Sequence, residues 1–145
     1  FATSRTYTPS LPAPTNGTAI PGLPLTEVKS RALFLGLGAN GGDLTTGFRS
    51  NAGAYNPFPF DVSITFSLYS AAGELLGQKR YDWMPHEARQ LNDIFAELGA
   101  PGVVTRNAYL VTVSTLPILP YVIVIDNQSG DSIYVRPTDD EAKPQ

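Results

Sequence analysis

The sequence predicts an all-β fold built from short strands. Its 145 residues include 13 Gly and 13 Pro, which divide the chain by turns and leave little room for long helices. Several runs alternate apolar and polar residues with the period of two that is typical of a strand with one buried face. Only the stretch 85–99 has apolar residues at helix-like spacing. The length fits a single domain with its own core.

Composition excludes several classes of protein. Hydrophobic residues make up 42% of the chain, charged residues make up 16%, and the formal net charge is -3. These values are typical of a soluble globular domain without a nucleic-acid partner, and no basic stripe is present. No apolar stretch reaches the roughly 20 residues that span a bilayer. Cysteine is absent, so no disulfide or thiolate site exists. The chain opens with Phe1 instead of Met, which suggests a processed or truncated product, and removal of a secretory signal is one ordinary way to produce such a chain.

Residues 1–27 are predicted to form an extended, Pro-rich N-terminal arm. This segment carries five prolines and has no period of 2 or 3.6. Such an arm becomes ordered by folding back on its own body or by lying on a neighbouring subunit. Both alternatives use apolar anchors, and the partner-binding candidates in the arm are Phe1, Tyr7, Leu11, Ile20 and Leu23.

The body, residues 28–137, is predicted to be a β-domain. We interpret the glycine cluster LGLGANGGD, residues 35–43, as a loop, because no Gly-Lys-Ser/Thr ending or helix signal follows it. The clearest strand is 61–69, with Val62, Ile64, Phe66 and Leu68 on one face. Gly73 then provides a tight turn into a partner strand over 74–83.

The next stretch, 85–99, is predicted to be extended through Leu91 and then helical for one or two turns. Asn92 or Asp93 would cap this short helical segment near 92–99, and Gly99 would end it.

Two further strands, NAYLVTVST (107–115) and TLPILPYVIVID (115–126), complete the body before the chain returns. Pro117 and Pro120 belong at the entry of the second strand, where no ladder donor is needed. The uniformly apolar run that follows is typical of a central strand. A returning strand begins at Ser132, and residues 138–145 form a polar C-terminal tail.

Four segments together carry a resemblance. GFRSNAGAYNP (47–57), VSITFSLYSAAGELLG (62–77), PHEARQLNDIF (85–95) and LPYVIVIDNQSGDSIYV (119–135) follow one another in a recognisable order. They resemble a family of secreted or cell-surface bacterial β-sandwich modules of unassigned function. This resemblance implies an immunoglobulin-like antiparallel β-sandwich, an extracytoplasmic location (periplasmic, cell surface or secreted) and no enzymatic activity.

The sequence offers little catalytic chemistry. A zinc site would need carboxylates in addition to the single histidine, His86, which we expect at the surface beside Pro85. No Gly-x-Ser-x-Gly elbow accompanies a Ser-His-Asp triad. We therefore expect a protein that is not an enzyme and binds no cofactor.

The polar cluster after the last long apolar run has two interpretations. Asp126, Asn127 and Asp131 supply oxygens that a hard cation prefers. The same residues, with Gly130 at positive φ, build a turn between two strands, which explains more of the pattern. Asn16 and Asn127 also lie in N-glycosylation sequons, and both positions suit a turn Asn.

Rim aromatics give the last candidates. Tyr81 and Trp83 fall near a predicted strand end, where such rings bind carbohydrate or another protein, or pack under the arm.

These observations leave two hypotheses for the function of the protein. The first is a structural or interaction subunit that docks into a larger assembly through its arm and sheet edges. The partners would be the same or different protein chains, such as those of a membrane-anchored complex. The alternative is a carbohydrate- or ligand-binding module.

Overall fold

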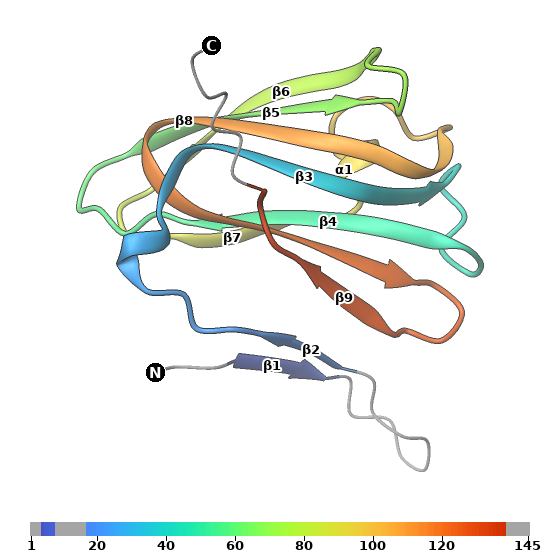
Figure 1. Cartoon of the computed structure of the whole chain (residues 1–145), viewed down its shortest axis with the longest axis horizontal. Helices are drawn as coiled ribbons and strands as arrows, with labels where there is room; N and C mark the ends of the chain where they lie inside the picture. The colour runs from blue at the N-terminus through green and yellow to red at the C-terminus, as the bar shows by residue number, and fades with distance from the viewer. Residues whose placement is uncertain (1–3, 8–16, 139–145) are drawn as a thin grey trace.

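The computed structural model describes residues 4–7 and 17–138 (Figure 1). The fold is all-β and antiparallel, as predicted, with one short α-helix among the described residues. The strands are β1 (Ser4–Tyr7), β2 (Gly17–Ile20), β3 (Lys29–Asn40), β4 (Phe48–Tyr55), β5 (Val62–Tyr69), β6 (Leu75–Trp83), β7 (Ala88–Leu91), β8 (Val104–Asp126) and β9 (Ser132–Val135).

Strand β8 organises the body. It extends over 23 residues, and its first half pairs with β3 and β5 while its second half pairs with β4 and β9. Strands β6 and β7 are added outside β5 and β4. Because both halves belong to one bent strand, the sheet curls into an open half-barrel (Figure 1). This architecture confirms the all-β prediction without establishing an immunoglobulin-like sandwich.

The prediction of two strands over 107–126 is wrong, because β8 is continuous through both prolines. Pro117 lies between the residues that pair with β5 and those that pair with β4, where β8 bends from one half of the sheet to the other. Pro120 lies opposite Ala54, and β9 pairs only with residues 122–125. A missing N–H is tolerated at positions where the ladder is interrupted or one-sided.

The main core lies inside the curl. Val62, Ile64, Phe66 and Leu68 of β5 are all fully buried, which confirms the predicted face. The predicted hairpin with β6 is also present, and Gly73 has a φ of 88° in its turn. The large ring of Trp83 joins these side chains in the core.

The glycine cluster at 35–43 is mostly strand, which corrects the loop interpretation. Strand β3 continues to Asn40, and its pairing with β8 shifts register between Leu35 and Leu37 and again between Leu37 and Ala39. Gly36 lies at the first shift with a φ of 76°. A glycine in this left-handed conformation allows the strand to bulge and then continue.

The short helix α1 (Ile94–Glu97) lies within the predicted helical segment. The Asp93 side chain accepts a hydrogen bond from the amide of Ala96, so Asp93 is the residue that caps the helix. Gly99 follows the helix with a φ of 87°, as the predicted end requires. Ile94 and Phe95 bury this segment against the core.

The described part of the N-terminal arm forms its own small sheet. Strands β1 and β2 pair with each other and with no other strand, and β2 lies beside β9 (Figure 1). The 3-10 helix Leu25–Glu27 then leads into β3. Phe1 and Leu11 lie outside the described residues, and the side chains of Tyr7 and Ile20 are also outside them.

At the other end, Thr138 pairs with Leu33 of β3. The remaining predicted tail, residues 139–145, lies outside the described chain, so the division into arm, body and tail stays a prediction. No helix in the described part of the chain is long and apolar enough to cross a membrane.

Candidate functional site

Two polar residues of the resemblance motifs, Arg49 and Asn127, meet at one end of the sheet. Arg49 donates a hydrogen bond from Nη1 to Oδ1 of Asn127 at 2.5 Å. The Nδ2 of Asn127 donates to the carbonyls of Asp43 and Thr46, at 3.0 Å each. One side chain therefore joins strand β4, the turn after β3 and the turn after β8.

The neighbouring motif residues are also bonded within the fold. The Ser50 hydroxyl accepts from the amide of Gly38 at 3.0 Å and donates to its carbonyl at 2.8 Å. Oδ1 of Asn51 accepts from the amide of Asp93 at 2.9 Å, which fixes the start of α1. Asn56 is fully buried and its amide nitrogen donates to two carbonyls, those of Phe60 and Met84. Burial of a polar group costs free energy unless the group is hydrogen-bonded, and these residues meet that requirement.

The cluster at 126–131 has the contacts of a turn. Oδ1 of Asp126 accepts from the amide of Gln128 at 2.8 Å, and the amide of Gly130 donates to the Asp126 carbonyl at 2.8 Å. Gly130 has a φ of 76°. In the described chain, no group of three or more His, Cys, Asp or Glu side chains is placed to hold a metal ion. These contacts favour the turn interpretation over a cation site.

Of the two N-glycosylation sequons, only the one at Asn127 lies within the described residues. The Nδ2 of Asn127, which would carry a glycan, is the atom that bonds two carbonyls in the fold. Asn16 lies outside the described residues.

Asp43 organises the turn that Asn127 contacts. Its carboxylate accepts from the Thr45 hydroxyl at 2.6 Å, the Thr46 hydroxyl at 2.6 Å and the Thr45 amide at 2.8 Å. Hydrogen bonds from Thr45, then from Thr46, lower the pKa of Asp43 from 3.8 to about 2. The carboxylate is fully exposed, so its role is to order the turn locally.

The rim aromatics are less accessible than we predicted. Trp83 is fully buried, and its Nε1 donates to the Ala54 carbonyl at 3.1 Å. The Arg89 guanidinium lies 4.0 Å from the centroid of the Trp83 ring. Trp83 is therefore a core residue capped by a cation, because its position on β6 turns inward, opposite Val62.

Tyr81 is half-buried, and both its ring and its hydroxyl contact neighbouring side chains. Its ring has the Lys79 ammonium at 4.9 Å, and its hydroxyl donates to Oε2 of Glu97 at 3.0 Å. Burial raises the pKa of Tyr81, and the hydrogen bond to Glu97 raises it further. Trp83 therefore presents no ring face for stacking a sugar, and the ring of Tyr81 is partly covered.

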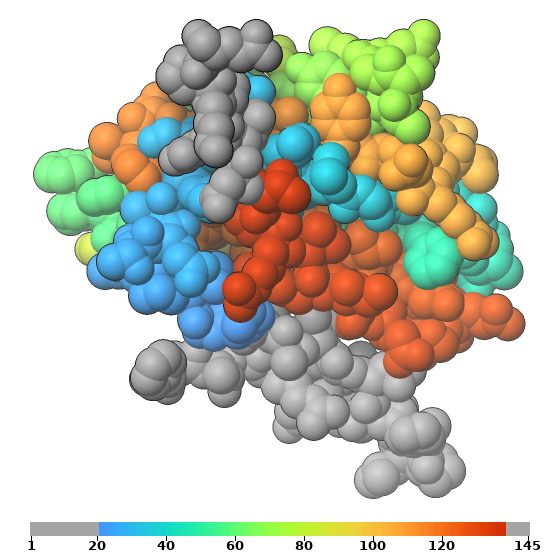
Figure 2. All heavy atoms as spheres, in the orientation of Figure 1, coloured from blue at the N-terminus to red at the C-terminus, as the bar shows by residue number. Residues whose placement is uncertain are grey.

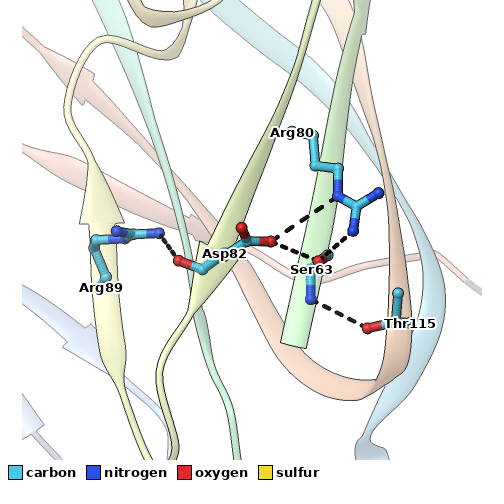
Figure 3. A network of polar contacts seen from close by, with 5 residues as sticks. All are labelled: Ser63, Arg80, Asp82, Arg89 and Thr115. Atoms are coloured by element: carbon cyan, nitrogen blue, oxygen red, sulfur yellow. Dashed lines mark hydrogen bonds and ion pairs between the residues drawn. The ribbon is translucent and has the colours of Figure 1, made fainter. Parts of the chain in front are cut away.

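A polar network covers the outer side of the β5–β6 pair (Figure 3). Ser63 donates to Oδ1 of Asp82 at 2.5 Å and accepts from Nη2 of Arg80 at 2.6 Å. The Arg89 Nη2 donates to the Asp82 carbonyl at 2.7 Å. The one histidine, His86, is exposed in the turn before β7, as expected. The network therefore has the character of a cross-strand surface ladder.

Described residues of the body line two clefts that bear on function. The first has a volume of about 290 Å³, lies between β3 and β9, and is lined mainly by apolar residues together with Arg106. The second, of about 240 Å³, lies where the arm joins the body, and it is lined by residues that include Leu23, Glu27, Tyr134 and Arg136. Leu23 is thus the predicted arm anchor whose side chain is described, and it contributes to the second cleft.

Comparison with known proteins bears on the fold alone. No protein-family model matches the sequence, and no curated protein matches it. The crystal structure of Thermotoga maritima 1070 is similar, with a TM-score of 0.58 over 76% of this chain and 95% of that chain. The sequence identity is 11%, so the likeness shows a shared arrangement of strands.

Sequence reasoning missed the Arg49–Asn127 contact and the first cleft. The sequence did contain a signal for the contact, since Arg49 and Asn127 both lie in segments on which the resemblance rests. The cleft had none, because its lining comes from two distant parts of the chain, β3 with β4 and β8 with β9.

Proposed function

We propose that this protein is a non-catalytic structural and interaction subunit of a larger extracytoplasmic assembly. In this proposal the body is a member of the immunoglobulin-like sandwich modules that it resembles, and the N-terminal arm, with the sheet edges, makes the contacts to other protein chains. Those chains are copies of this protein or different subunits.

The observation that carries the proposal is the separate β1–β2 sheet. These strands form a two-stranded sheet of their own, apart from the seven-stranded sheet of the body, and β2 lies beside β9 (Figure 1). The segment that connects them to β3 is largely exposed, including Leu25 with 64% of its surface accessible. A preformed element on an exposed connection is suited to exchange between neighbouring chains at low energetic cost.

The motif residues give a second line of support. Arg49, Ser50, Asn51 and Asn56 all bond backbone or side-chain groups of other segments. Their hydrogen bonds are used to hold the strands and turns in place, as expected of a module whose task is to present a surface. The carbohydrate-binding alternative loses its main support, because Trp83 is fully buried.

The test compares the full chain with a variant that begins at Val28, by light scattering at matched concentration and by urea unfolding. We expect the full chain to form an oligomer or to co-purify with other chains, and the shortened chain to be a folded monomer. A full chain that stays monomeric, and that binds no other chain in a pull-down from the source cells, would contradict the proposal. Protease treatment of intact cells tests the location, since an extracytoplasmic subunit is accessible from outside.

A further inference from the structure

The cleft between β3 and β9 is an apolar opening at the seam of the half-barrel. Figure 2 shows the face of the molecule on which the spheres of β9 (red) lie beside those of β3 (blue). Val124 and Val135, which line the cleft, also pack against the core. Ile133 adds an apolar side chain with 68% of its surface exposed. The cleft therefore continues the core outward to solvent.

Arg106 is the charged residue of this cleft. Its guanidinium lies 5.0 Å from the centroid of the Phe48 ring, which is part of the same lining. In the described part of the chain, no Asp or Glu forms an ion pair with Arg106. Arg106 is exposed, and a cation beside an apolar surface favours a ligand with the complementary pair of features, an apolar body and one carboxylate.

We propose that the cleft binds a small amphiphilic carboxylate. The apolar body lies against Phe48, Val124 and Ile133, and the carboxylate pairs with the guanidinium of Arg106. A volume of about 290 Å³ is close to the lower limit of small-molecule pockets, about 300 Å³, which suits a ligand of about ten non-hydrogen atoms. Octanoate has this size and this chemistry.

A small molecule fits the cleft better than an added peptide strand does. Strand addition needs free amide and carbonyl groups along a regular edge. At Gly38 both groups are already bonded to the Ser50 hydroxyl. At Gly36 the φ of 76° takes the backbone out of the extended conformation. The β3 side of the cleft thus lacks the regular ladder that a peptide would require.

This binding site is independent of the proposed assembly through the arm, and either can hold without the other. The probes are octanoate, octanol and octylamine, below their micellar concentrations, and binding is followed by chemical shifts in amide NMR spectra and by calorimetry. We expect octanoate to bind roughly two-fold to ten-fold more tightly than octanol, because a hydrogen bond to a charged group is stronger than one between neutral groups and an ion pair with an exposed arginine adds only modestly to affinity. Octylamine, which carries the wrong charge, is expected to bind most weakly.

Two variants separate the two halves of the proposal. Arg106→Gln is expected to reduce octanoate affinity to that of octanol while leaving octanol unchanged, and Ile133→Ser is expected to weaken both. Arg80→Gln and Leu75→Ser are matched controls, since they alter an exposed arginine and an exposed leucine that do not line the cleft. Equal affinity for octanoate and octanol would overturn the proposal. So would shifts that map away from the lining residues, or binding of an extended apolar peptide without binding of octanoate.

Discussion

Arg49 and Asn127 are 78 positions apart in the chain, yet they share a hydrogen bond of 2.5 Å that joins strand β4 to the turn between β8 and β9. Both residues belong to the motifs on which the resemblance rests. Because Asn127 also bonds two carbonyls of the turn after β3, its side chain connects three segments at one end of the half-barrel.

The first prediction concerns this link. Asn127→Ala is expected to lower the free energy of unfolding by about 2 kcal/mol, since it removes three hydrogen bonds and leaves the Arg49 guanidinium without this partner. Arg49→Met, combined with Asn127→Ala in a double-mutant cycle, is expected to show a coupling of about 1 to 2 kcal/mol. Urea unfolding measures both. The control is Gln128→Ala at the exposed next position, and equal effects of the two alanine variants would show that the link carries no stability.

The second prediction concerns Gly53. A Cβ at this position would collide with the Tyr121 ring and lie 2.8 Å from the Arg89 carbonyl. Gly53→Ala is therefore expected to destabilise the protein by about 1 to 3 kcal/mol. Gly102→Ala is the matched control, because an added Cβ there meets nothing within 4 Å, and it is expected to change stability by less than about 0.5 kcal/mol.

The third prediction uses Trp83 as a probe. It is the single tryptophan of the chain, so intrinsic fluorescence reports on its surroundings. Arg89→Ala uncovers one face of the ring, and we expect greater quenching by acrylamide together with a red shift of the emission. Arg80→Ala removes an exposed arginine from the neighbouring surface ladder and is expected to leave the emission unchanged. Identical quenching in the two variants would mean that Arg89 does not shield the ring.

The fourth prediction concerns acid. The pKa of Asp43 is lowered to about 2 in the folded chain. The stability that its ionised carboxylate gives the turn is therefore fully present above about pH 4 and is lost as the pH falls toward 2. Carbon NMR of the Asp43 carboxyl measures this titration, and hydrogen exchange at Thr45 follows the loosening of the turn. In Asp43→Asn the exchange at Thr45 is expected to be fast throughout this range. A titration midpoint near 3.8 would show that the threonine hydrogen bonds do not form in solution.

Local patterns predicted local structure well. The alternation over Val62–Tyr69 identified a strand and its buried face, and a cap residue followed by Gly99 identified the short helix. In each case the signal and the structure lie within about ten residues, where side-chain period and backbone preference act directly.

The predictions that were wrong concern residues whose local structure or burial depends on partners far away in the sequence. Gly36 indicates a loop when it is considered alone, but pairing with β8 makes it a bulge within a strand. Pro117 indicates a strand boundary, but the bend of β8 accommodates it. Trp83 lies at a strand end, and only its register opposite Val62 reveals that it is buried. Pairing across the sheet decided all three, and a single sequence does not contain that pairing.

The central position of β8 has a consequence for how the protein is made. Strands β3, β4 and β5 all precede β8 in the chain and all pair with it, so their pairing with β8 waits until residues 104–126 have been synthesised. At translation rates of about 5 to 20 residues per second, roughly 5 to 20 s separate the synthesis of β3 from that of the end of β8. During this interval the nascent chain exposes the apolar faces of three strands. Late completion of this kind predicts slow folding and a dependence on chaperones during synthesis.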